Sequence, residues 1–323
     1  MNKKKIALLG CGNIANFHIP ALVEAGFEIV GVSGRKNSKT VEVFANKYGI
    51  DKYYNDPIDL IKSDRWDCLV IATPVGTVFD YIVKASKYSN FKPILCEKPV
   101  ENEYDKFINV DLYKNVRVAY NRRFYNTVQY AKNFIDTHPQ AVIRVSVPES
   151  SSLSDSKTFP GRLPYYVYEN SSHIFDAIKY MLCGLNWTSV VNNEDGSQYL
   201  STIALGVGGA GNKVVLDMIY DAPQNFSIDI IDKEDRVEMR PIEILRHYKG
   251  MKVVEPSKEF PIRQYKPNLY KEIISSSNEN SNLKPGFLEQ SKDFMSFCTS
   301  GVSDGATLKD AKSTIGLIDE LLN

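Results

Sequence analysis

The sequence predicts an α/β protein of two domains, the first of which contains a doubly wound parallel sheet. Short apolar runs alternate with amphipathic helical patterns in the N-terminal third, which is typical of parallel strands covered on both faces. Later segments alternate apolar and polar residues with hairpin-length gaps, which indicates an antiparallel sheet. The length of 323 residues corresponds to about two domains. We expect the boundary near residue 120, giving domains of 1–120 and 121–323.

The elements of the first domain are predicted from their periodicity and their end signals. Strands are expected at 5–9, 28–33, 68–72, 93–96 and 116–120. Helices are expected between them, at 16–25, 39–48, 58–62 and 78–87. Gly49 ends the second helical pattern, as glycine commonly does at helix C-termini.

The second domain is expected to combine several strands with four helices. Strands are predicted at 141–147, 199–205, 213–220, 226–232 and 236–240. Helical spacing occurs at 127–137, from Glu169 to Met181, at 287–298 and at 308–322. The Ser-rich stretch 150–156 is predicted to be a surface loop.

Composition excludes several classes of protein. A hydrophobic fraction of 43% with 24% charged residues excludes a disordered chain and a coiled coil. Basic and acidic residues number 39 each, so the whole chain lacks the basic footprint of a nucleic-acid binder. Five scattered cysteines without a C-x-x-C pair indicate reduced thiols in a cytosolic protein.

Targeting and metal-binding signals are not expected either. Only four residues separate Lys5 from Gly10, too few for the apolar core of a signal peptide, and no later stretch is long enough to span a membrane. We therefore expect a cytoplasmic protein without membrane or nucleic-acid partners. The histidines lack ligand-like spacing with each other or with cysteine, so no metal site is predicted from His18, His138, His173 and His247.

A phosphate-binding loop is predicted between the first strand and the first helix. The hexapeptide Gly10-Cys11-Gly12-Asn13-Ile14-Ala15 matches G-x-G-x-x-A. Gly10 permits the tight turn, Gly12 lets the backbone approach a pyrophosphate, and Ala15 allows close helix packing. The following helix N-terminus offers free N–H groups to the anion. The predicted cofactor contacts here are Gly10, Gly12, Asn13 and Ile14; the alternative is a glycine turn that serves packing alone.

A second glycine-rich string, residues 206–211, is interpreted differently. Strand-like alternation follows it at 214–219, where a phosphate loop would begin a helix. We therefore expect a hairpin turn there.

The residues after the second strand bear on the choice of nicotinamide cofactor. An NAD site places Asp or Glu here to bind the ribose 2′-hydroxyl, but the sequence has no carboxylate at this point. One charge-assisted hydrogen bond to a 2′-phosphate contributes about 1.5–3 kcal/mol, which is roughly a ten- to hundredfold preference. NADP is therefore favoured over NAD, unless this is simply a solvated turn, and the predicted contacts are Ser33, Gly34, Arg35 and Lys36.

Two side chains are candidates for the chemistry. Lys98 follows the strand at 93–96, at the sheet edge where open α/β sheets bind ligands, and can stabilise negative charge on a substrate oxygen. His173 lies four residues after Glu169 in a helical pattern, so the carboxylate can orient the imidazole as a general base requires. Each residue alone has a structural interpretation, as a strand end or as a buried histidine.

Together, and in this order, these motifs resemble the glucose-fructose oxidoreductase/inositol dehydrogenase (Gfo/Idh/MocA) family of nicotinamide-dependent sugar oxidoreductases. The resemblance covers most of the chain. It rests on residues 10–15, Ala72-Thr73-Pro74, Cys96-Glu97-Lys98-Pro99, Tyr120-Asn121-Arg122-Arg123-Phe124, His173 with Asp176, and 307–311.

The resemblance implies a Rossmann domain followed by an α/β domain with a large, open, mostly antiparallel sheet that commonly packs in homo-oligomers. It implies that Lys98 contacts nicotinamide ribose and substrate and that His173 is the acid/base group for the reacting hydroxyl. Glu169 would hold His173 or bind a neighbouring hydroxyl. The further cofactor contacts are Ala72, Thr73, Pro74 and Glu97, and the candidate substrate contacts are Arg123, Tyr165, Tyr168 and Asp176.

The sequence departs from the family pattern at two places. The family has Asp-x-Gly-x-His, whereas this chain has Glu169 and Ser171 in the Asp and Gly positions, and Val75-Gly76 replaces a polar pair. We expect an NADP-dependent oxidoreductase acting on a small sugar, polyol or nucleotide-sugar derivative. The alternatives are a non-catalytic NAD(P)-binding regulator of the same fold and a reductase of linear aldehydes or imines.

Overall fold

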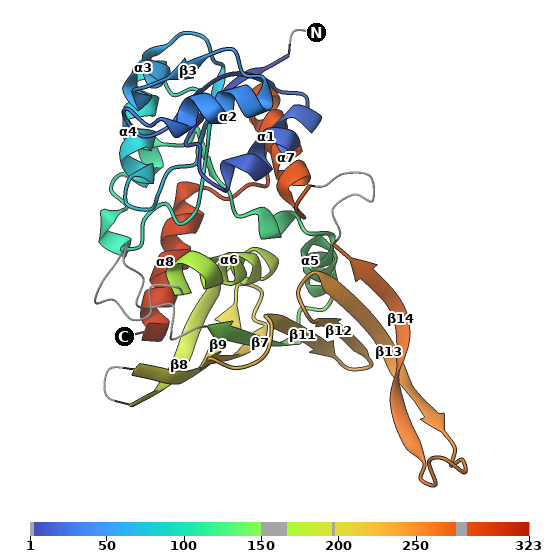
Figure 1. The fold of residues 1–323 in the computed structure, drawn as a ribbon. Helices are drawn as coiled ribbons and strands as arrows, with labels where there is room; N and C mark the ends of the chain where they lie inside the picture. The colour runs from blue at the N-terminus through green and yellow to red at the C-terminus, as the bar shows by residue number, and fades with distance from the viewer. Residues whose placement is uncertain (1–2, 150–166, 196–197, 276–282, 323) are drawn as a thin grey trace. The chain divides into compact units, whose positions relative to one another are not determined.

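The computed structural model describes residues 3–149, 167–195, 198–275 and 283–322 (Figure 1). The chain forms two compact units, one containing residues 1–124 and 277–316 and the other containing 125–276 and 317–323. The first crossing lies close to the predicted boundary at 120. The prediction placed all of 121–323 in the second domain, however, whereas the structure returns residues 277–316 to the first unit, because amphipathic spacing does not reveal which sheet a helix covers.

The first unit contains a six-stranded sheet in the order β3-β2-β1-β4-β5-β6, and all its pairs are parallel. The order reverses beside β1, which is the topological switch point of a Rossmann fold. The strands are β1 (Lys5–Leu9), β2 (Glu28–Ser33), β3 (Tyr53–Tyr54), β4 (Cys68–Ile71), β5 (Ile94–Cys96) and β6 (Val116–Val118). All of these except the two-residue β3 were predicted from the sequence.

Helices lie between these strands, as predicted. They are α1 (Ala15–Glu24), α2 (Thr40–Tyr48), α3 (Pro57–Lys62) and α4 (Val78–Ser89). Helix α7 (Phe287–Ser300) adds Phe294 to the same core, where its ring stacks on Phe27 with centroids 6.0 Å apart. This packing explains why a C-terminal segment belongs to the N-terminal unit.

The second unit contains an eight-stranded sheet in the order β14-β13-β12-β11-β7-β10-β9-β8. Within the described part of this second sheet, β7 and β10 are the only strands that pair in parallel. The expected large and mostly antiparallel sheet is therefore confirmed. The strands are β7 (Val142–Glu149), β8 (Leu185–Asp195), β9 (Gln198–Gly208), β10 (Lys213–Tyr220), β11 (Ser227–Asp232), β12 (Asp235–Met239), β13 (Ile244–Val254) and β14 (Gln264–Ile274). Strands β8, β13 and β14 were not predicted from the sequence.

One face of this sheet is covered by helices. Residues of α5 (Asn126–Thr137), α6 (Ser172–Met181) and the end of α8 (Leu308–Leu322) share its core. The second glycine-rich string forms the β9–β10 hairpin, in which Gly211 N–H donates to Gly208 O. The predicted hairpin turn is therefore confirmed. The Ser-rich stretch 150–156 lies outside the described residues.

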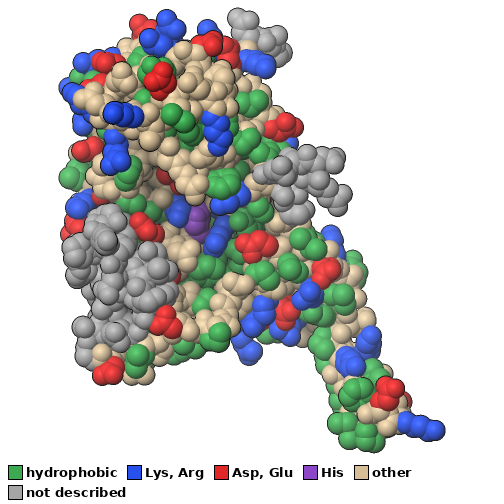
Figure 2. Space-filling model, viewed as in Figure 1, with side chains coloured by type: hydrophobic (Ala, Val, Ile, Leu, Met, Phe, Trp, Pro, Cys, Tyr) green, Lys and Arg blue, Asp and Glu red, His purple; other side chains and the backbone are tan. Residues whose placement is uncertain are grey.

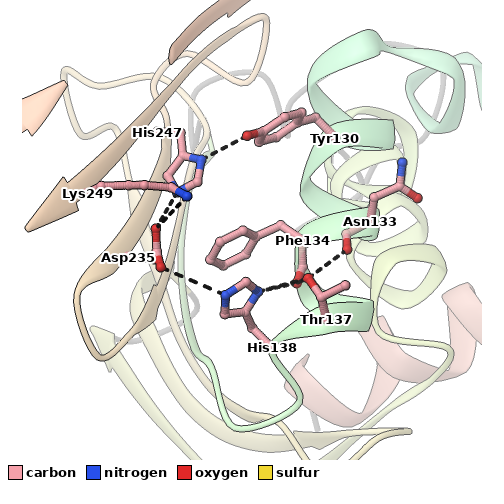
Figure 3. Close-up of polar contacts among 8 residues, drawn as sticks. All are labelled: Tyr130, Asn133, Phe134, Thr137, His138, Asp235, His247 and Lys249. Carbon is pink, nitrogen blue, oxygen red and sulfur yellow. Dashed lines mark hydrogen bonds and ion pairs between the residues drawn. The ribbon is translucent and has the colours of Figure 1, made fainter. Parts of the chain in front are cut away.

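The β13–β14 hairpin extends beyond the rest of the sheet (Figure 1). Figure 2 shows hydrophobic side chains gathered along it at the lower right. Met251, Val253, Tyr265 and Leu269 are each more than half exposed. A polar cluster fixes the base of the hairpin to α5: His247 lies 2.8 Å from both Tyr130 Oη and Asp235 Oδ1 (Figure 3).

Asp235 also approaches His138, at 4.0 Å, so two histidines that are distant in sequence share one carboxylate. Within the described residues no group of three or more His, Cys, Asp or Glu is arranged to hold a metal ion. In the same part of the chain, no helix is long and apolar enough to cross a membrane.

Candidate active site

The phosphate loop has the backbone that its glycines predict. Gly10 adopts φ +114°, and a Cβ there would lie 2.1 Å from the carbonyl oxygen of Ala72. A Cβ on Gly12 would meet no atom within 4 Å, so this glycine leaves space open. The N-cap residue of α1, Ile14, makes no side-chain capping bond, and the first turn has no acidic residue. The loop and the positive helix end therefore fit an anion such as a pyrophosphate.

A cleft of about 500 Å³ lies over this loop. It is formed by loops that follow β1, β2 and β4, at the carboxyl ends of adjacent strands, where doubly wound sheets bind nucleotides. Its lining includes many predicted cofactor residues, namely Gly10, Gly12, Ile14, Gly34, Arg35, Ala72, Thr73 and Pro74.

Other lining residues were missed by the sequence analysis: Cys11, Ser38, Thr40, Thr77 and Tyr81. Thr77 and Tyr81 are four residues apart at the start of α4, and this spacing after the Thr-Pro turn was the signal available. Burial raises the pKa of the Cys11 thiol to about 12. Cys11 therefore contributes a neutral side chain to the cleft at physiological pH.

Two of the predicted 2′-phosphate contacts are engaged elsewhere. The Ser33 hydroxyl is buried and donates to the carbonyl oxygen of Tyr54, 3.0 Å away on β3. The exposed Lys36 ammonium lies 3.0 Å from Asp56 Oδ2. Ser33 and Lys36 therefore do not line the cleft, and neither do Asn13, Glu97 and Lys98.

Asp56 is a carboxylate that inspection of the β2 end did not reveal, because it follows β3. Its Oδ1 accepts a 2.8 Å hydrogen bond from Ile58 N–H at the start of α3. This bond, reinforced by Lys36, lowers the pKa of Asp56. Asp56 thus neutralises the charge of Lys36, and Arg35 is the cation in the cleft lining.

The Glu97-Lys98-Pro99 turn follows β5, as predicted. The Lys98–Pro99 peptide bond is cis, and Lys98 is half-buried. Glu97 is buried, and its Oε2 accepts a 3.2 Å hydrogen bond from the backbone N–H of Lys98. Its Oε1 lies 2.6 Å from Nε2 of His18, a buried residue of α1. The sequence predicted no metal site at His18, and the contact of His18 with Glu97 was not predicted.

The proposed acid/base residues lie at the start of α6. The prediction assumed one α-helix through Glu169 and His173, but the structure has a π-helical turn over Val167–Ser171 before α6 begins. The wider turn changes which side chains align, and such turns are frequent at functional sites. Glu169 and His173 are half-buried, and Asp176 is fully buried. Lys98 belongs to the first unit and His173 to the second, so their meeting over one ligand stays a prediction.

Comparisons with known proteins bear on the family. The family described as "Oxidoreductase family, NAD-binding Rossmann fold" matches residues 4–115. The scyllo-inositol 2-dehydrogenase (NAD(+)) of Bacillus subtilis is 33% identical over 98 residues, 30% of this chain and 28% of that protein. An inositol 2-dehydrogenase of Mycolicibacterium smegmatis is 28% identical over 144 residues, 42% of this chain and 41% of that protein. The alignments thus span less than half of these relatives.

The whole fold also has solved counterparts. Levoglucosan dehydrogenase in complex with NADH and L-sorbose superposes with a TM-score of 0.78 at 14% identity, covering 100% of this chain and 96% of that one. An oxidoreductase from Agrobacterium radiobacter in complex with NAD+, L-tartaric acid and magnesium gives 0.76 at 17% identity, covering 98% and 95%. Residues 4–115 thus match the Gfo/Idh/MocA family of oxidoreductases, and the two relatives aligned above are inositol dehydrogenases. The resemblance predicted from the motifs is confirmed.

The structure accommodates one departure from the predicted family pattern. Ser171, which stands in the Gly position, points its hydroxyl at Glu149 Oε2 of β7, 2.5 Å away, and both residues are buried. The added side chain is thus accommodated within the second unit.

Three predicted substrate contacts have varied surroundings. Arg123 is buried and lies 3.7 Å from Asp310 Oδ2, which also caps Thr307 N–H at 2.8 Å. Tyr168 donates its hydroxyl to Asp319 Oδ1 at 2.5 Å. Tyr165 lies outside the described residues. The roles of these side chains toward a substrate stay predictions.

Proposed function

We propose that the protein is an NAD(P)-dependent dehydrogenase or ketoreductase acting on a ring hydroxyl or ketone of a sugar, polyol or nucleotide-sugar derivative. The observation that carries this proposal is the cleft over the phosphate loop, together with a lysine that follows a neighbouring strand of the same sheet. The names of the relatives, inositol dehydrogenases above all, support the substrate class.

The residues divide the chemistry between them. The bound dinucleotide supplies the nicotinamide that accepts or donates a hydride. The Lys98 ammonium hydrogen-bonds the reacting oxygen and stabilises its developing negative charge. His173 takes the hydroxyl proton during oxidation and returns it during reduction. Glu169 holds the imidazole or binds a neighbouring hydroxyl.

We further propose NADP as the favoured cofactor, with NAD as the alternative. Arg35 lines the cleft after β2, where its guanidinium can form paired hydrogen bonds with a 2′-phosphate. No acidic residue of the described chain appears in that lining. The name of the Bacillus subtilis relative includes NAD(+), and the Agrobacterium radiobacter oxidoreductase was solved with NAD+, so the two cofactors have to be compared directly.

Turnover measurements test the proposal. The purified protein is incubated with NADPH or NADH and cyclic ketoses, and in the reverse direction with NADP+ or NAD+ and inositols or levoglucosan, while the nicotinamide absorbance is followed. We expect turnover that is abolished in Lys98→Ala and His173→Ala. Full activity of either variant would contradict its assigned role. Tight NADPH binding without turnover on the whole panel would instead favour the regulator.

The outer face of the second sheet supports a proposed homo-oligomer. Leu205 pairs with Val215 and Ile203 with Val191 across neighbouring strands, and all four side chains are at least one-third exposed. Contiguous exposed apolar surface of this kind commonly marks a protein interface.

A further inference from the structure

We propose that His18 is a positioning residue for Lys98, acting through Glu97. This inference rests on the proposed function and adds to it a residue that contacts neither cofactor nor substrate. The Nε2 of His18 lies 2.6 Å from Glu97 Oε1, and Glu97 Oε2 in turn accepts the backbone N–H of Lys98. Glu97 thus links the imidazole to the residue whose ammonium the reaction uses.

The contact joins two separate parts of the nucleotide-binding unit. His18 lies one turn after Ile14, in the helix that begins at the phosphate loop. Glu97 follows β5, where its own N–H is bonded to Ile71 O of β4. The hydrogen bond therefore ties the element that would hold the phosphates to the turn that carries Lys98.

Burial holds the two side chains in place and determines which nitrogen of His18 carries the proton. The exposed fraction is 1% for His18 and 8% for Glu97. Among the described residues His18 Nδ1 has no hydrogen-bond partner, and the ring edge packs on Phe287 with centroids 5.1 Å apart. A buried N–H without a partner costs more than an unpaired ring nitrogen of neutral histidine. We therefore place the proton on Nε2, which donates to the Glu97 carboxylate.

Because Nε2 of His18 is the donor and Glu97 the acceptor, we can predict which substitutions of His18 are tolerated. Glutamine carries an N–H donor at the same distance along the side chain as Nε2, so His18→Gln keeps the bond to Glu97. His18→Leu fills the apolar surroundings but leaves a buried carboxylate oxygen without its donor. The Lys98 backbone would then lose the restraint that Glu97 provides.

Backbone amide exchange in the cofactor-free protein tests the link directly. In His18→Leu, hydrogen–deuterium exchange of peptides that contain Lys98 should accelerate roughly tenfold, while peptides from β9 and β10 exchange as in wild type. His18→Gln should restore protection. Unchanged exchange at Lys98 in His18→Leu would overturn the proposal, and so would acceleration spread evenly over the whole chain.

Kinetics supply the second readout once a substrate is known. We expect His18→Leu to lower kcat roughly tenfold to hundredfold, with little change in KM for the cofactor, and His18→Gln to recover most of it. His138→Gln is the matched control and should leave kcat unchanged. A kcat unchanged in His18→Leu would contradict positioning. Failure of wild-type turnover would reject the proposed function alone, because the exchange measurement is independent of it.

Discussion

The hydroxyl of Ser171 donates a 2.5 Å hydrogen bond to the buried carboxylate of Glu149. This bond connects the π-helical turn before α6 to the end of β7, within the second unit. The candidate base His173 lies two residues further along the chain. The departure from the family glycine is therefore a structural bond that supports the start of α6.

Removal of this hydroxyl is expected to destabilise the protein. Ser171→Ala leaves an oxygen of Glu149 without one donor, which costs about 1–3 kcal/mol in the free energy of unfolding. Urea denaturation checks the loss. Ser172→Ala is a matched control, since within the described residues that hydroxyl makes a single, long hydrogen bond, to Glu169 O at 3.5 Å. Equal stability of the two variants would contradict the importance of the Glu149 bond.

Alanine substitutions at the two glycines of the phosphate loop are expected to impair different properties, cofactor binding at Gly12 and stability at Gly10. Gly12→Ala should fold with an unchanged Tm, because its Cβ meets no protein atom, yet lose cofactor binding, because the methyl group occupies the space that a pyrophosphate needs. Gly10→Ala should lower the Tm itself, since its Cβ would collide with Ala72 O. Differential scanning fluorimetry with and without NADPH separates the two effects. Undiminished NADPH binding by Gly12→Ala would place the cofactor elsewhere.

Arg35 is expected to determine the preference for NADP. Arg35→Ala should weaken NADPH binding roughly tenfold to hundredfold by removing a charge-assisted hydrogen bond, and leave NADH binding nearly unchanged. Lys36→Ala, the matched control, should have a smaller effect because Asp56 already pairs with this ammonium. Titration of the nicotinamide fluorescence gives both affinities. Equal losses for NADPH and NADH would mean that Arg35 does not read the 2′-phosphate.

Glu101 is expected to make the fold less stable as the pH rises. Burial raises the pKa of this carboxyl, and Oε2 has no hydrogen-bond partner among the described residues. Because the folded state binds the proton more tightly than the unfolded state, ionisation above a pH of about 4 favours unfolding. Glu101→Gln should therefore be about 1 kcal/mol more stable than wild type at neutral pH, and the gap should close in acid.

Thermal unfolding between pH 4 and pH 8 measures that gap. Glu24→Gln serves as the control, because Glu24 is exposed at the end of α1. A constant difference between Glu101→Gln and wild type at every pH would show that the carboxyl does not titrate in this range.

The proposed oligomer interface is expected to depend on the apolar outer face of the sheet. Leu205→Lys and Val215→Lys, made separately, each place a positive charge on this apolar face, at positions that pair across β9 and β10. Each variant should shift the molecular mass measured by light scattering to that of the monomer. Val302→Lys, exposed in the first unit, should leave the mass unchanged. Retention of the oligomer in both sheet variants would place the interface elsewhere.

The sequence predicted the nucleotide-binding unit well because its signals are local. Strands such as Lys5–Leu9 and Glu28–Ser33 are buried on both faces and appear as short apolar runs. The edge strand β14 and its neighbour β13 were missed because their outward positions mix Tyr, Lys and Met, so neither periodicity dominates. The hydrogen bond between His18 and Glu97 joins residues 79 positions apart, and no sequence spacing encodes such a contact.

Helix α8 contributes to both units, since its residues up to Gly316 belong to the first and those from Leu317 to the second. Ile318 and Leu321 are fully buried in the core of the second sheet, while Phe294 of α7 completes the core of the first. During synthesis, neither core is complete until Phe294 and Leu321 have left the ribosome. Early stop codons and C-terminal truncations should therefore yield nascent chains dependent on chaperones, even when every residue of the phosphate loop is intact.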